Sequence, residues 1–407
     1  MNINKKEAYE RALIFLHESL TTSGFLASTT NVDNYKRIWT RDGIITGLAA
    51  LTTEDGDLHT GVKNTLNTIS EYQGPHGEIP SNIDIERSSV SYGGLAGRVD
   101  APLWYIIGVC TYALRMKDND FAVKHKSNMD RSLYLAACWE FNNKDFIYAP
   151  ASGDWADEYY FHGYTLLVQL LYFFTLRVYG LIFDDKKYLE KASRLESLID
   201  VNYWIDKKNI KNSLTYHPNA LEQILEKKGS ISYWLPAFSP LGYTLRFDGF
   251  ANSLILLSGI GDKEKTNSLV DYVKSLCNKL ETWLIPGFYP QIRENDKEWD
   301  QLKANNKYAF KNYPDESHNG GLWPMVTGFW GAGLAFRGEI ELAEKTLDAI
   351  NKSNFLDTEN GLWGFYEWHH GKTKEPMGTR HTTWSAAGAI ILHQALYAKI
   401  FPFIKDL

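Results

Sequence analysis

Cysteine is scarce in this 407-residue chain. Its three residues, Cys110, Cys138 and Cys277, are odd in number and far apart, which excludes a disulfide framework and a cysteine-type zinc site. Charge of one sign is also lacking, since 43 Lys and Arg residues stand against 49 Asp and Glu residues and give a formal charge of −6. No basic stripe is present, so the sequence carries no electrostatic footprint for nucleic-acid binding.

Long hydrophobic segments are missing as well. No stretch reaches the roughly 18 apolar residues that a membrane span needs, and the N-terminus is charged where a signal peptide has its apolar core. There is no Gly-rich phosphate loop, no strand-led dinucleotide fingerprint and no Gly-x-Ser-x-Gly elbow. We therefore expect a soluble cytoplasmic protein with no membrane or nucleic-acid partner and no cofactor. Nothing in the sequence predicts its oligomeric state.

Aromatic residues, in contrast, are abundant. The chain has 13 Trp, 24 Tyr and 20 Phe, and many of them lie beside Gly, Pro, Asp or His. Such residues supply cores and interfaces, but rings also stack on the apolar faces of sugars while neighbouring polar groups take the hydroxyls. Their gathering in long loops favours sugar binding.

The apolar spacing is helical almost throughout. It predicts helices over 5–20, 43–52, 57–72, 101–115, 130–140, 163–178, 186–201, 245–259, 263–280, 321–335, 339–350 and 382–399. The best strand candidate is 231–235. Long loops rich in aromatic, Gly and Pro residues separate some of these helices, over 73–99, 142–161, 205–244, 281–320 and 352–381.

About twelve helices with elaborate loops indicate six helical hairpins closed into a ring. We predict an all-α fold, an (α/α)6 barrel with long aromatic-rich loops at one end, formed by a single domain over residues 1–407. An open helical solenoid is the alternative, but no repeat of fixed length supports it.

Two acidic motifs lie at predicted helix starts. In Trp39-Thr40-Arg41-Asp42, Asp42 is a candidate helix cap and Arg41 a candidate surface ion pair. An Arg-Asp couple beside a ring also offers a monosaccharide a donor, an acceptor and a flat face. Asp100, which precedes another predicted helix, is likewise either a cap or a ligand-binding group.

Two further motifs place carboxyl groups among rings. The segment 152–160 carries Asp154, Asp157 and a third acid next to Trp155. An apolar setting raises a carboxyl pKa, which is how an acid keeps its proton near neutral pH, although a solvated acidic turn is the alternative. Glu367, flanked by aromatic residues, is a candidate base that deprotonates a water molecule. The alternative is a structural residue at a hairpin tip whose carboxylate is hydrogen-bonded within the protein. The neighbouring His369 and His370 lack a helical His partner, so we predict no catalytic metal.

The ordered motifs resemble those of the alkaline/neutral invertases, which are inverting glycoside hydrolases on an (α/α)6 barrel. The resemblance is carried by His-Asn-Gly-Gly-Leu-Trp-Pro at 318–324, Tyr-Glu at 366–367, Gly-Lys at 371–372 and Thr-Trp-Ser-Ala-Ala-Gly at 383–388. Upstream, Trp-Thr-Arg-Asp at 39–42, Gly-Arg-Val-Asp at 97–100 with Leu-Trp at 103–104, and Asp157 before Gly-Tyr at 163–164 and Gln169 match in the same order. The resemblance spans roughly residues 35–390.

The resemblance implies roles for these residues. Asp157 matches the family's general acid and Glu367 its general base. The positions similar to the sugar-binding wall are Trp39, Arg41, Asp42, Asp100, His318, Trp323 and Trp384, to which we add Trp155 beside the acidic turn.

The acidic turn departs from the family pattern. Invertases carry an Ile-Asp-Arg-Arg stretch there, whereas this chain reads Asp-Trp-Ala-Asp at 154–157, which resembles amylo-α-1,6-glucosidase-like and glucosylglycerate-hydrolase-like proteins. The spacing from Asp157 to Gly163 is one residue shorter than in invertases, so Asp154 is a second candidate for the acid.

We therefore expect an inverting, exo-acting α-glucosidase that acts on a short saccharide such as sucrose, an isomaltose-type sugar or glucosylglycerate. A sugar 2-epimerase on the same barrel, using two of His162, His217, His318 and His381, is the alternative. A carbohydrate-binding protein without catalysis is a third possibility. A polysaccharide lyase is disfavoured because the loops hold few basic residues.

Overall fold

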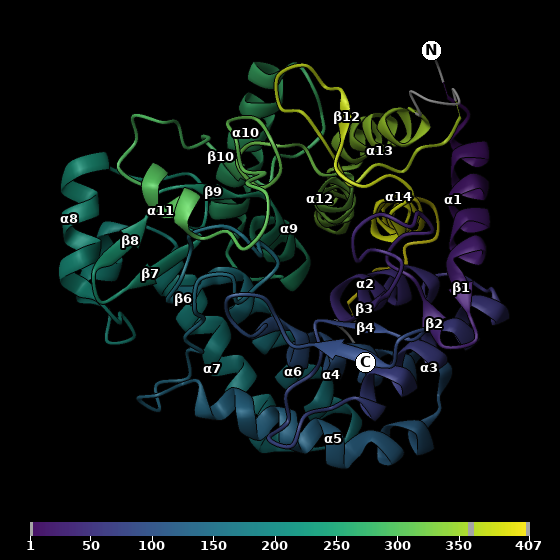
Figure 1. Ribbon diagram of the computed structural model, residues 1–407. Helices are drawn as coiled ribbons and strands as arrows, with labels where there is room; N and C mark the ends of the chain where they lie inside the picture. The colour runs from purple at the N-terminus through teal and green to yellow at the C-terminus, as the bar shows by residue number, and fades with distance from the viewer. Residues whose placement is uncertain (1–2, 357–361, 404–407) are drawn as a thin grey trace.

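Helices that are buried on nearly every side form the centre of the molecule. In residues 3–356 and 362–403, which the structure describes, this computed structural model contains 14 α-helices (Figure 1). A helix that is buried on nearly every side belongs in a core, and the described residues form six of them: α2 (Thr40–Ala50), α4 (Asp100–Met116), α6 (Leu166–Ile182), α9 (Gly249–Ser258), α12 (Pro324–Arg337) and α14 (Thr383–Tyr397). Each contacts the next in this order and α14 contacts α2, so the six close into a ring.

Helices with one buried face alternate with the inner ones along the chain and cover the ring. They are α1 (Lys5–Ser19), α3 (Gly56–Glu71), α5 (Asn119–Cys138), α7 (Lys186–Tyr203), α10 (Lys263–Leu280) and α13 (Ile340–Phe355). In Figure 1 α1 and α13 flank α14, and α7 lies along α6, in agreement with their contacts. The predicted all-α (α/α)6 barrel is therefore confirmed.

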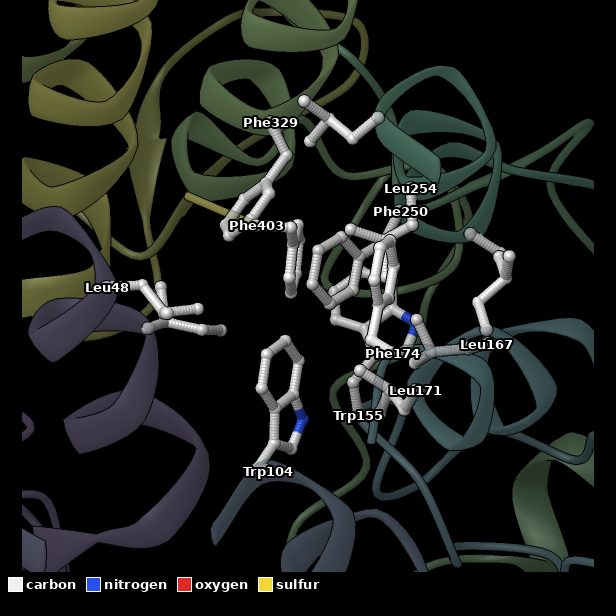
Figure 2. Packing of buried hydrophobic residues seen from close by; sticks show 14 of the residues in the cluster. Leu48, Trp104, Trp155, Leu167, Leu171, Phe174, Phe250, Leu254, Phe329 and Phe403 are labelled. Carbon is white, nitrogen blue, oxygen red and sulfur yellow. The ribbon is translucent and has the colours of Figure 1, made fainter. Parts of the chain in front are cut away.

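Large side chains fill the inside of the ring. Figure 2 shows them converging from five inner helices: Leu48 of α2, Trp104 of α4, Phe174 of α6, Phe250 of α9 and Phe329 of α12. Phe403, which follows α14, also lies among them, and its ring stacks on that of Phe174 with the centroids 4.1 Å apart. The barrel centre is a packed core, which leaves the loops at its ends for binding.

Short strands occur in the connecting loops and pair only antiparallel among the described residues. They form five small sheets: β1 (Leu20–Thr21) with β2 (Gly24–Phe25); β3 (Ile38–Trp39), β4 (Asn82–Asp84) and β5 (Ser89–Ser91); β6 (Tyr164–Thr165), β7 (Ala237–Ser239) and β8 (Gly242–Thr244); β9 (Phe247–Asp248) with β10 (Phe288–Tyr289); and β11 (Trp368–His369) with β12 (Pro376–Met377). Because β3, β6 and β9 each lead directly into an inner helix, these sheets fix the loop residues at the mouth of the barrel.

Three sequence expectations about elements were wrong. The segment 231–235 is not a strand, because the backbone N–H and C=O of Trp234 bond to the side chain of Asn252 instead of to another strand. Helix α5 begins at Asn119, well before the predicted position 130. The loops 205–244 and 281–320 contain helices that were not predicted, α8 (Pro218–Lys228), the 3-10 helix η1 (Lys207–Lys211) and α11 (Trp299–Ala304).

The predicted loop 352–381 includes residues 357–361, which lie outside the described part of the chain. Within that part, none of the helices has both the length and the apolar character to cross a bilayer.

Candidate active site

Arg41 connects three segments at the mouth of the barrel. It lies in the first turn of α2, and its Nε donates to Oδ2 of Asp100, the first residue of α4, at 2.7 Å. Both of its Nη atoms lie 3.2 Å from Oδ1 of Asp157, and Nη2 donates to the backbone oxygen of Asp154 at 2.8 Å. Burial alone lowers the pKa of Arg41, but the carboxylates of Asp100 and Asp157 outweigh it and raise that pKa. A single cation thus fixes the acidic turn against the two inner helices.

A second arginine faces the other oxygen of Asp157. Nη2 of Arg98 lies 3.0 Å from Oδ2, and Nη1 donates to the backbone oxygen of Ser152. The Arg98 side chain is 7% exposed, whereas that of Asp157 is 25% exposed. The Asp157 carboxyl group is therefore held by a guanidinium at each oxygen and is still reached by solvent.

Glu367 occupies a separate loop, directly before β11. Its Oε1 accepts a hydrogen bond from the Tyr35 hydroxyl at 2.8 Å, and its Oε2 accepts one from the backbone N–H of Thr379 at 3.3 Å. Burial raises the pKa of Glu367, the two hydrogen bonds oppose this, and the charge of Asp157 adds to the rise. The electrostatic effect of Asp157 indicates that these two carboxyl groups, distant in the sequence, share one region of the molecule.

Asp42 is a third buried carboxyl group in this region. It is 4% exposed, and burial raises its pKa to about 7, against the opposing effect of Arg41. The charges of Glu367 and Asp157 both add to this rise in the pKa of Asp42. Asp42 is therefore within electrostatic reach of both candidate catalytic residues, as expected of a group in the same pocket wall.

Aromatic side chains pack behind these charges. The Trp155 ring makes edge contacts with His318 at 4.8 Å and with Trp323 at 5.3 Å between centroids. Trp323 in turn stacks on His318 at 4.9 Å and contacts the edge of Trp384 at 5.6 Å. Trp155, Trp323 and Trp384 are all nearly fully buried. These four residues, called here the aromatic floor, form one continuous cluster.

Trp39 lies apart from the aromatic floor. Its ring is half-buried and stacks on Tyr35 at 6.3 Å, and its Nε1 donates to the backbone oxygen of Asn34 at 2.9 Å. Through Tyr35, Trp39 belongs to the wall next to Glu367.

Several buried polar atoms in this region have no partner within the described residues. They are Oδ1 of Asp100 and the ring nitrogens Nε1 of Trp155, Nε2 of His318 and Nε1 of Trp384. Burial lowers the pKa of His318 to about 4, so its ring is neutral at neutral pH. A buried unpaired polar atom is costly, and a cluster of them beside carboxyl groups is what a hydroxyl-rich ligand would satisfy.

The two candidate acids differ in their surroundings. Oδ1 of Asp154 accepts the backbone N–H of Ala156 at 3.1 Å, and burial, together with the charge of Asp100, raises the pKa of Asp154 to about 6. Asp154 is 9% exposed, whereas a quarter of the Asp157 side chain is open to solvent. Exposure thus favours Asp157 as the group that a substrate would reach.

Two residues at this site were not among the predicted ones. Arg98 belongs to a quoted motif but was given no role, because its ion pair with Asp157 depends on how two loops meet. Tyr35 lies four residues before Trp39 in a polar stretch, and no spacing rule links it to Glu367, 332 positions away. An aromatic residue next to an expected sugar-binding motif was the only signal available for it.

A metal-like group of side chains lies on the surface. Among the described residues, the ligand atoms of His17, Asp55 and Asp57 lie close enough together to hold a metal ion. Asp55 already caps α3 and pairs with His17 at 2.8 Å. This group touches none of the site residues above.

Comparison with known proteins agrees with this geometry. The sequence model of the alkaline and neutral invertase family matches residues 5–399. Cytosolic invertase 1 of Oryza sativa subsp. japonica is 22% identical, with 96% of this chain and 77% of that protein covered. Probable alkaline/neutral invertase D of Arabidopsis thaliana is also 22% identical, with 96% and 81% covered.

Solved structures share the fold. A GH63 mannosylglycerate hydrolase from Thermus thermophilus in complex with glucose superimposes with a TM-score of 0.67 at 13% identity, covering 94% of this chain and 99% of that one. A bacterial glucoamylase complexed with acarbose superimposes with a TM-score of 0.65 at 16% identity, covering 97% of this chain and 56% of that one.

The barrel and its carboxyl-rich, ring-lined mouth define a glycoside hydrolase. Within that class, the chain belongs to the alkaline and neutral invertase family. The names of its relatives include cytosolic, chloroplastic and mitochondrial invertases, so the cytoplasmic location stays a prediction.

Proposed function

We propose that this enzyme is an inverting, exo-acting α-glucosidase with Asp157 as general acid and Glu367 as general base. The observation that carries the proposal is that one short segment at the start of α2 contacts both carboxyl groups. The Tyr35 hydroxyl donates to Glu367 at 2.8 Å, and both Nη atoms of Arg41 lie 3.2 Å from Oδ1 of Asp157. This supports a single site that holds the two carboxyl groups a glycosidase needs. The small glycoside in the name of the mannosylglycerate hydrolase, which shares the fold, supports a small substrate.

Each carboxyl group has its own task in this mechanism. Asp157 gives its proton to the glycosidic oxygen as the bond to the anomeric carbon breaks. Ionised Glu367 takes a proton from a water molecule that attacks the opposite face of that carbon, so the product has the inverted configuration. The hydrogen bond from Tyr35 holds Glu367 in the orientation for this step.

The two arginines constrain the first step. Because a guanidinium N–H faces each oxygen of Asp157, one oxygen must be released before it can carry the transferred proton. Arg41 is tied to Asp100 and to two backbone oxygens, whereas Arg98 has one further bond, to Ser152. We therefore assign the proton to Oδ2, the oxygen that faces Arg98.

The sugar-binding wall is assigned to the predicted residues around this pair. Asp42 takes a hydroxyl group at one side, whereas Arg41, whose N–H groups are already bonded, holds Asp157 in place. At the aromatic floor the unpaired ring N–H of Trp384 donates to a hydroxyl, and Nε2 of His318 contacts another. Trp155 and Trp323 support the floor from below, and Trp39 forms the wall beside Tyr35.

The epimerase alternative needs two histidines at one site. His162 is exposed, His217 caps the start of α8, and His381 packs against Phe15 of α1. Of these four histidines, only His318 belongs to the aromatic floor. Because these histidines do not share one site, the structure favours hydrolysis by two carboxyl groups over epimerisation by two histidines.

The test is a hydrolysis screen with sucrose, maltose, isomaltose, trehalose, kojibiose and glucosylglycerate, in which the product anomer is followed by NMR. We expect one of these α-glucosides to release β-glucose first. Asp157→Asn and Glu367→Gln should each lower kcat by about 10²–10⁴-fold, the usual contribution of general acid–base catalysis.

Asp154→Asn and Glu158→Gln serve as neighbouring carboxyl controls and should retain most of the activity. Loss of turnover in Asp154→Asn with a wild-type rate in Asp157→Asn would move the acid to Asp154. A retained anomer would reject inversion, and the carboxyl groups would then be about 5 Å apart rather than about 6.5–9.5 Å.

A further inference from the structure

Asn312 joins the segment of the proposed general acid to the aromatic floor. It lies in the loop between α11 and α12 and is 1% exposed. Its Nδ2 donates to the backbone oxygen of Glu158, the residue after Asp157, at 2.9 Å. Its Oδ1 accepts the backbone N–H of His318, a member of the floor, at 3.0 Å. One buried amide therefore connects the acidic turn (152–160) with the ring cluster at which the sugar is expected to bind.

The backbone of Asn312 is itself held in place. Its oxygen accepts a hydrogen bond from Nδ2 of Asn319 at 3.0 Å. Asn319 is fully buried, and its side chain bonds both the backbone N–H and the backbone oxygen of Ile292, at 2.6 and 2.8 Å. Asn312 is therefore a fixed support, although it lies in a long loop.

The acidic turn is bonded at both of its ends. The two arginines described above bond backbone oxygens in its first half. In the second half, Nδ2 of Asn305 donates to the backbone oxygen of Tyr159, and Oδ1 of Asn305 accepts the Ser152 hydroxyl at 2.8 Å. Asn312 acts in the same half. The backbone around Asp157 is thus fixed from two sides, while a quarter of its side chain stays open to solvent.

The chemistry of the two contacts requires an amide at position 312. The backbone N–H of His318 can only donate and the backbone oxygen of Glu158 can only accept, so the side chain between them needs one acceptor and one donor. A carboxylate supplies the acceptor alone. Loss of the donor would leave the Glu158 oxygen without this bond and release the segment next to Asp157.

We propose that Asn312 is a positioning residue for the general acid: its amide fixes the distance between Asp157 and the aromatic floor. This inference rests on the proposed function, because it takes Asp157 as the acid. Asn312 acts through the backbone of Glu158 and not on the reacting atoms. A displacement of about 1 Å at a catalytic group can cost about 10²-fold in rate, so a small shift of the acidic turn is enough to matter.

The experiment compares kcat/KM for two substrates, the α-glucoside selected by the hydrolysis screen and α-glucosyl fluoride. Fluoride is a weak base and leaves with little help from an acid, whereas a sugar oxygen needs the proton. Asn312→Asp keeps the acceptor for His318 and removes the donor to Glu158. We expect it to lower the glucoside-to-fluoride ratio by about 10–10²-fold. Both rates come from one sample, so the ratio does not depend on the fraction of the variant that is folded.

Two catalytic variants calibrate this ratio. Asp157→Asn should lower it by about 10²–10⁴-fold, because only the glucoside needs the acid. Glu367→Gln should slow both substrates and leave the ratio near that of the wild type, because both need the attacking water.

Asn202→Asp is the matched control. Asn202 is fully buried in α7, outside the site, and its amide also has one role on each side. Its Nδ2 donates to the backbone oxygen of Leu214 at 2.9 Å, and its Oδ1 accepts the backbone N–H of Tyr216 at 2.6 Å. This variant should keep the wild-type ratio even if it is less stable.

The outcomes separate the inference from the proposed function. Equal losses on both substrates in Asn312→Asp, or a wild-type ratio, would overturn the positioning role while leaving the acid in place. A wild type that hydrolyses neither substrate, or a wild-type ratio in Asp157→Asn, would instead reject the proposed function and this inference with it. If Asn312→Asp does not fold, Asn305→Asp takes its place, since the half-buried Asn305 holds the same turn at Tyr159. An unchanged ratio in that variant would equally overturn the inference.

Discussion

Tyr35 is the residue that most directly sets the state of the candidate base. Its hydroxyl donates to Oε1 of Glu367 at 2.8 Å, and this bond opposes the rise in the pKa of Glu367 that burial causes. A general base must be ionised, so the rate rises as the pH passes its pKa.

We expect Tyr35→Phe to shift the acidic limb of the pH profile to higher pH. The hydrogen bond from Tyr35 lowers the pKa of Glu367, whereas burial raises it. Without the hydroxyl the effect of burial is larger in proportion, so the pKa of Glu367 rises further. The rate at the optimum should fall roughly tenfold, the effect of losing one hydrogen bond to a charged group. A profile of log kcat/KM from about pH 4 to pH 9 measures both effects.

Tyr203→Phe is the control for this prediction. The Tyr203 side chain is fully buried, and its hydroxyl donates to the backbone oxygen of Tyr164 at 2.9 Å, outside the group of site residues. Its profile should keep the wild-type limb. If Tyr35→Phe gives the same limb as the wild type, Glu367 is not the group that the profile reports.

The residue types of the site could be read from the sequence, but their contacts could not. The rings around Glu367 and around the acidic segment 152–160 are a local feature, and the family resemblance then selected Asp157 from the acids of that segment. The bonds of Asp157 to Arg41 and Arg98 join segments 116 and 59 positions apart, which no local pattern encodes. Local chemistry thus predicts candidates, and the folded loops decide which of them meet.

The outer helices α1, α3 and α10 were predicted to within one residue of their observed ends, because one buried face gives them a clear helical period. The ends of several inner helices were missed by a few residues, because helices buried on nearly every side have a weaker period. Helices α8 and α11 were missed because they lie inside loops rich in Gly, Pro and aromatic residues. Tertiary contacts stabilise such short helices more than their own propensity does.

The contact between α12 and α14 depends on glycine. A Cβ atom at Gly328 would lie 2.2 Å from the backbone oxygen of Gly388 and 2.4 Å from its Cα. We expect Gly328→Ala to force the two helices apart and to lower the free energy of unfolding by about 3 kcal/mol. Urea unfolding followed by circular dichroism measures the change.

Gly56→Ala tests whether alanine itself is the cause. Gly56 starts α3, and a Cβ atom there meets nothing within 4 Å. This variant should be as stable as the wild type or more stable by about 0.5 kcal/mol, because alanine restricts the unfolded chain. Equal losses at both positions would show that close packing of α12 on α14 is not responsible.

Closure of the ring is a property of the whole molecule. About twelve helices with elaborate loops predicted six hairpins, and the contact of α14 with α2 completes the ring. That residues 1–407 form a single domain stays a prediction. The loops that precede the inner helices meet at the mouth of the barrel. This explains why the site residues come from loops far apart in the sequence.

This gathering brings several buried acids together. Burial raises the pKa of Asp42 to about 7, that of Asp154 to about 6 and that of Asp248 to about 8. Asp42 and Asp248 lie at the starts of inner helices, where backbone N–H groups and the helix dipole tolerate them. In the unfolded chain each of these groups loses its proton near its ordinary value, so the folded protein binds more protons between about pH 4 and pH 8.

The stability that these three carboxyl groups contribute should consequently fall as the pH rises from about 5 to 7. Buried or half-buried histidine rings act in the opposite direction up to about pH 6.5, because burial lowers the pKa of His125, His318, His369 and His393 to about 4. A carboxyl group with a raised folded-state pKa contributes up to about 1.4 kcal/mol of loss for each pH unit in this window. Asp248→Asn removes that contribution, because the amide does not ionise and its oxygen still accepts the N–H groups of Phe250 and Ala251. The denaturant midpoint of Asp248→Asn relative to that of the wild type, measured at about pH 5, 6 and 7, should therefore rise with pH.

Asp262→Asn, at the exposed start of α10, is the matched control for this slope. The pKa of Asp262 is lowered by its hydrogen bond to the backbone N–H of Lys265, so Asp262 stays ionised throughout the same window. Its variant should keep the wild-type slope, because neither the folded nor the unfolded chain takes up a proton at this position. Parallel slopes for all three proteins would mean that Asp248 is ionised in the folded state.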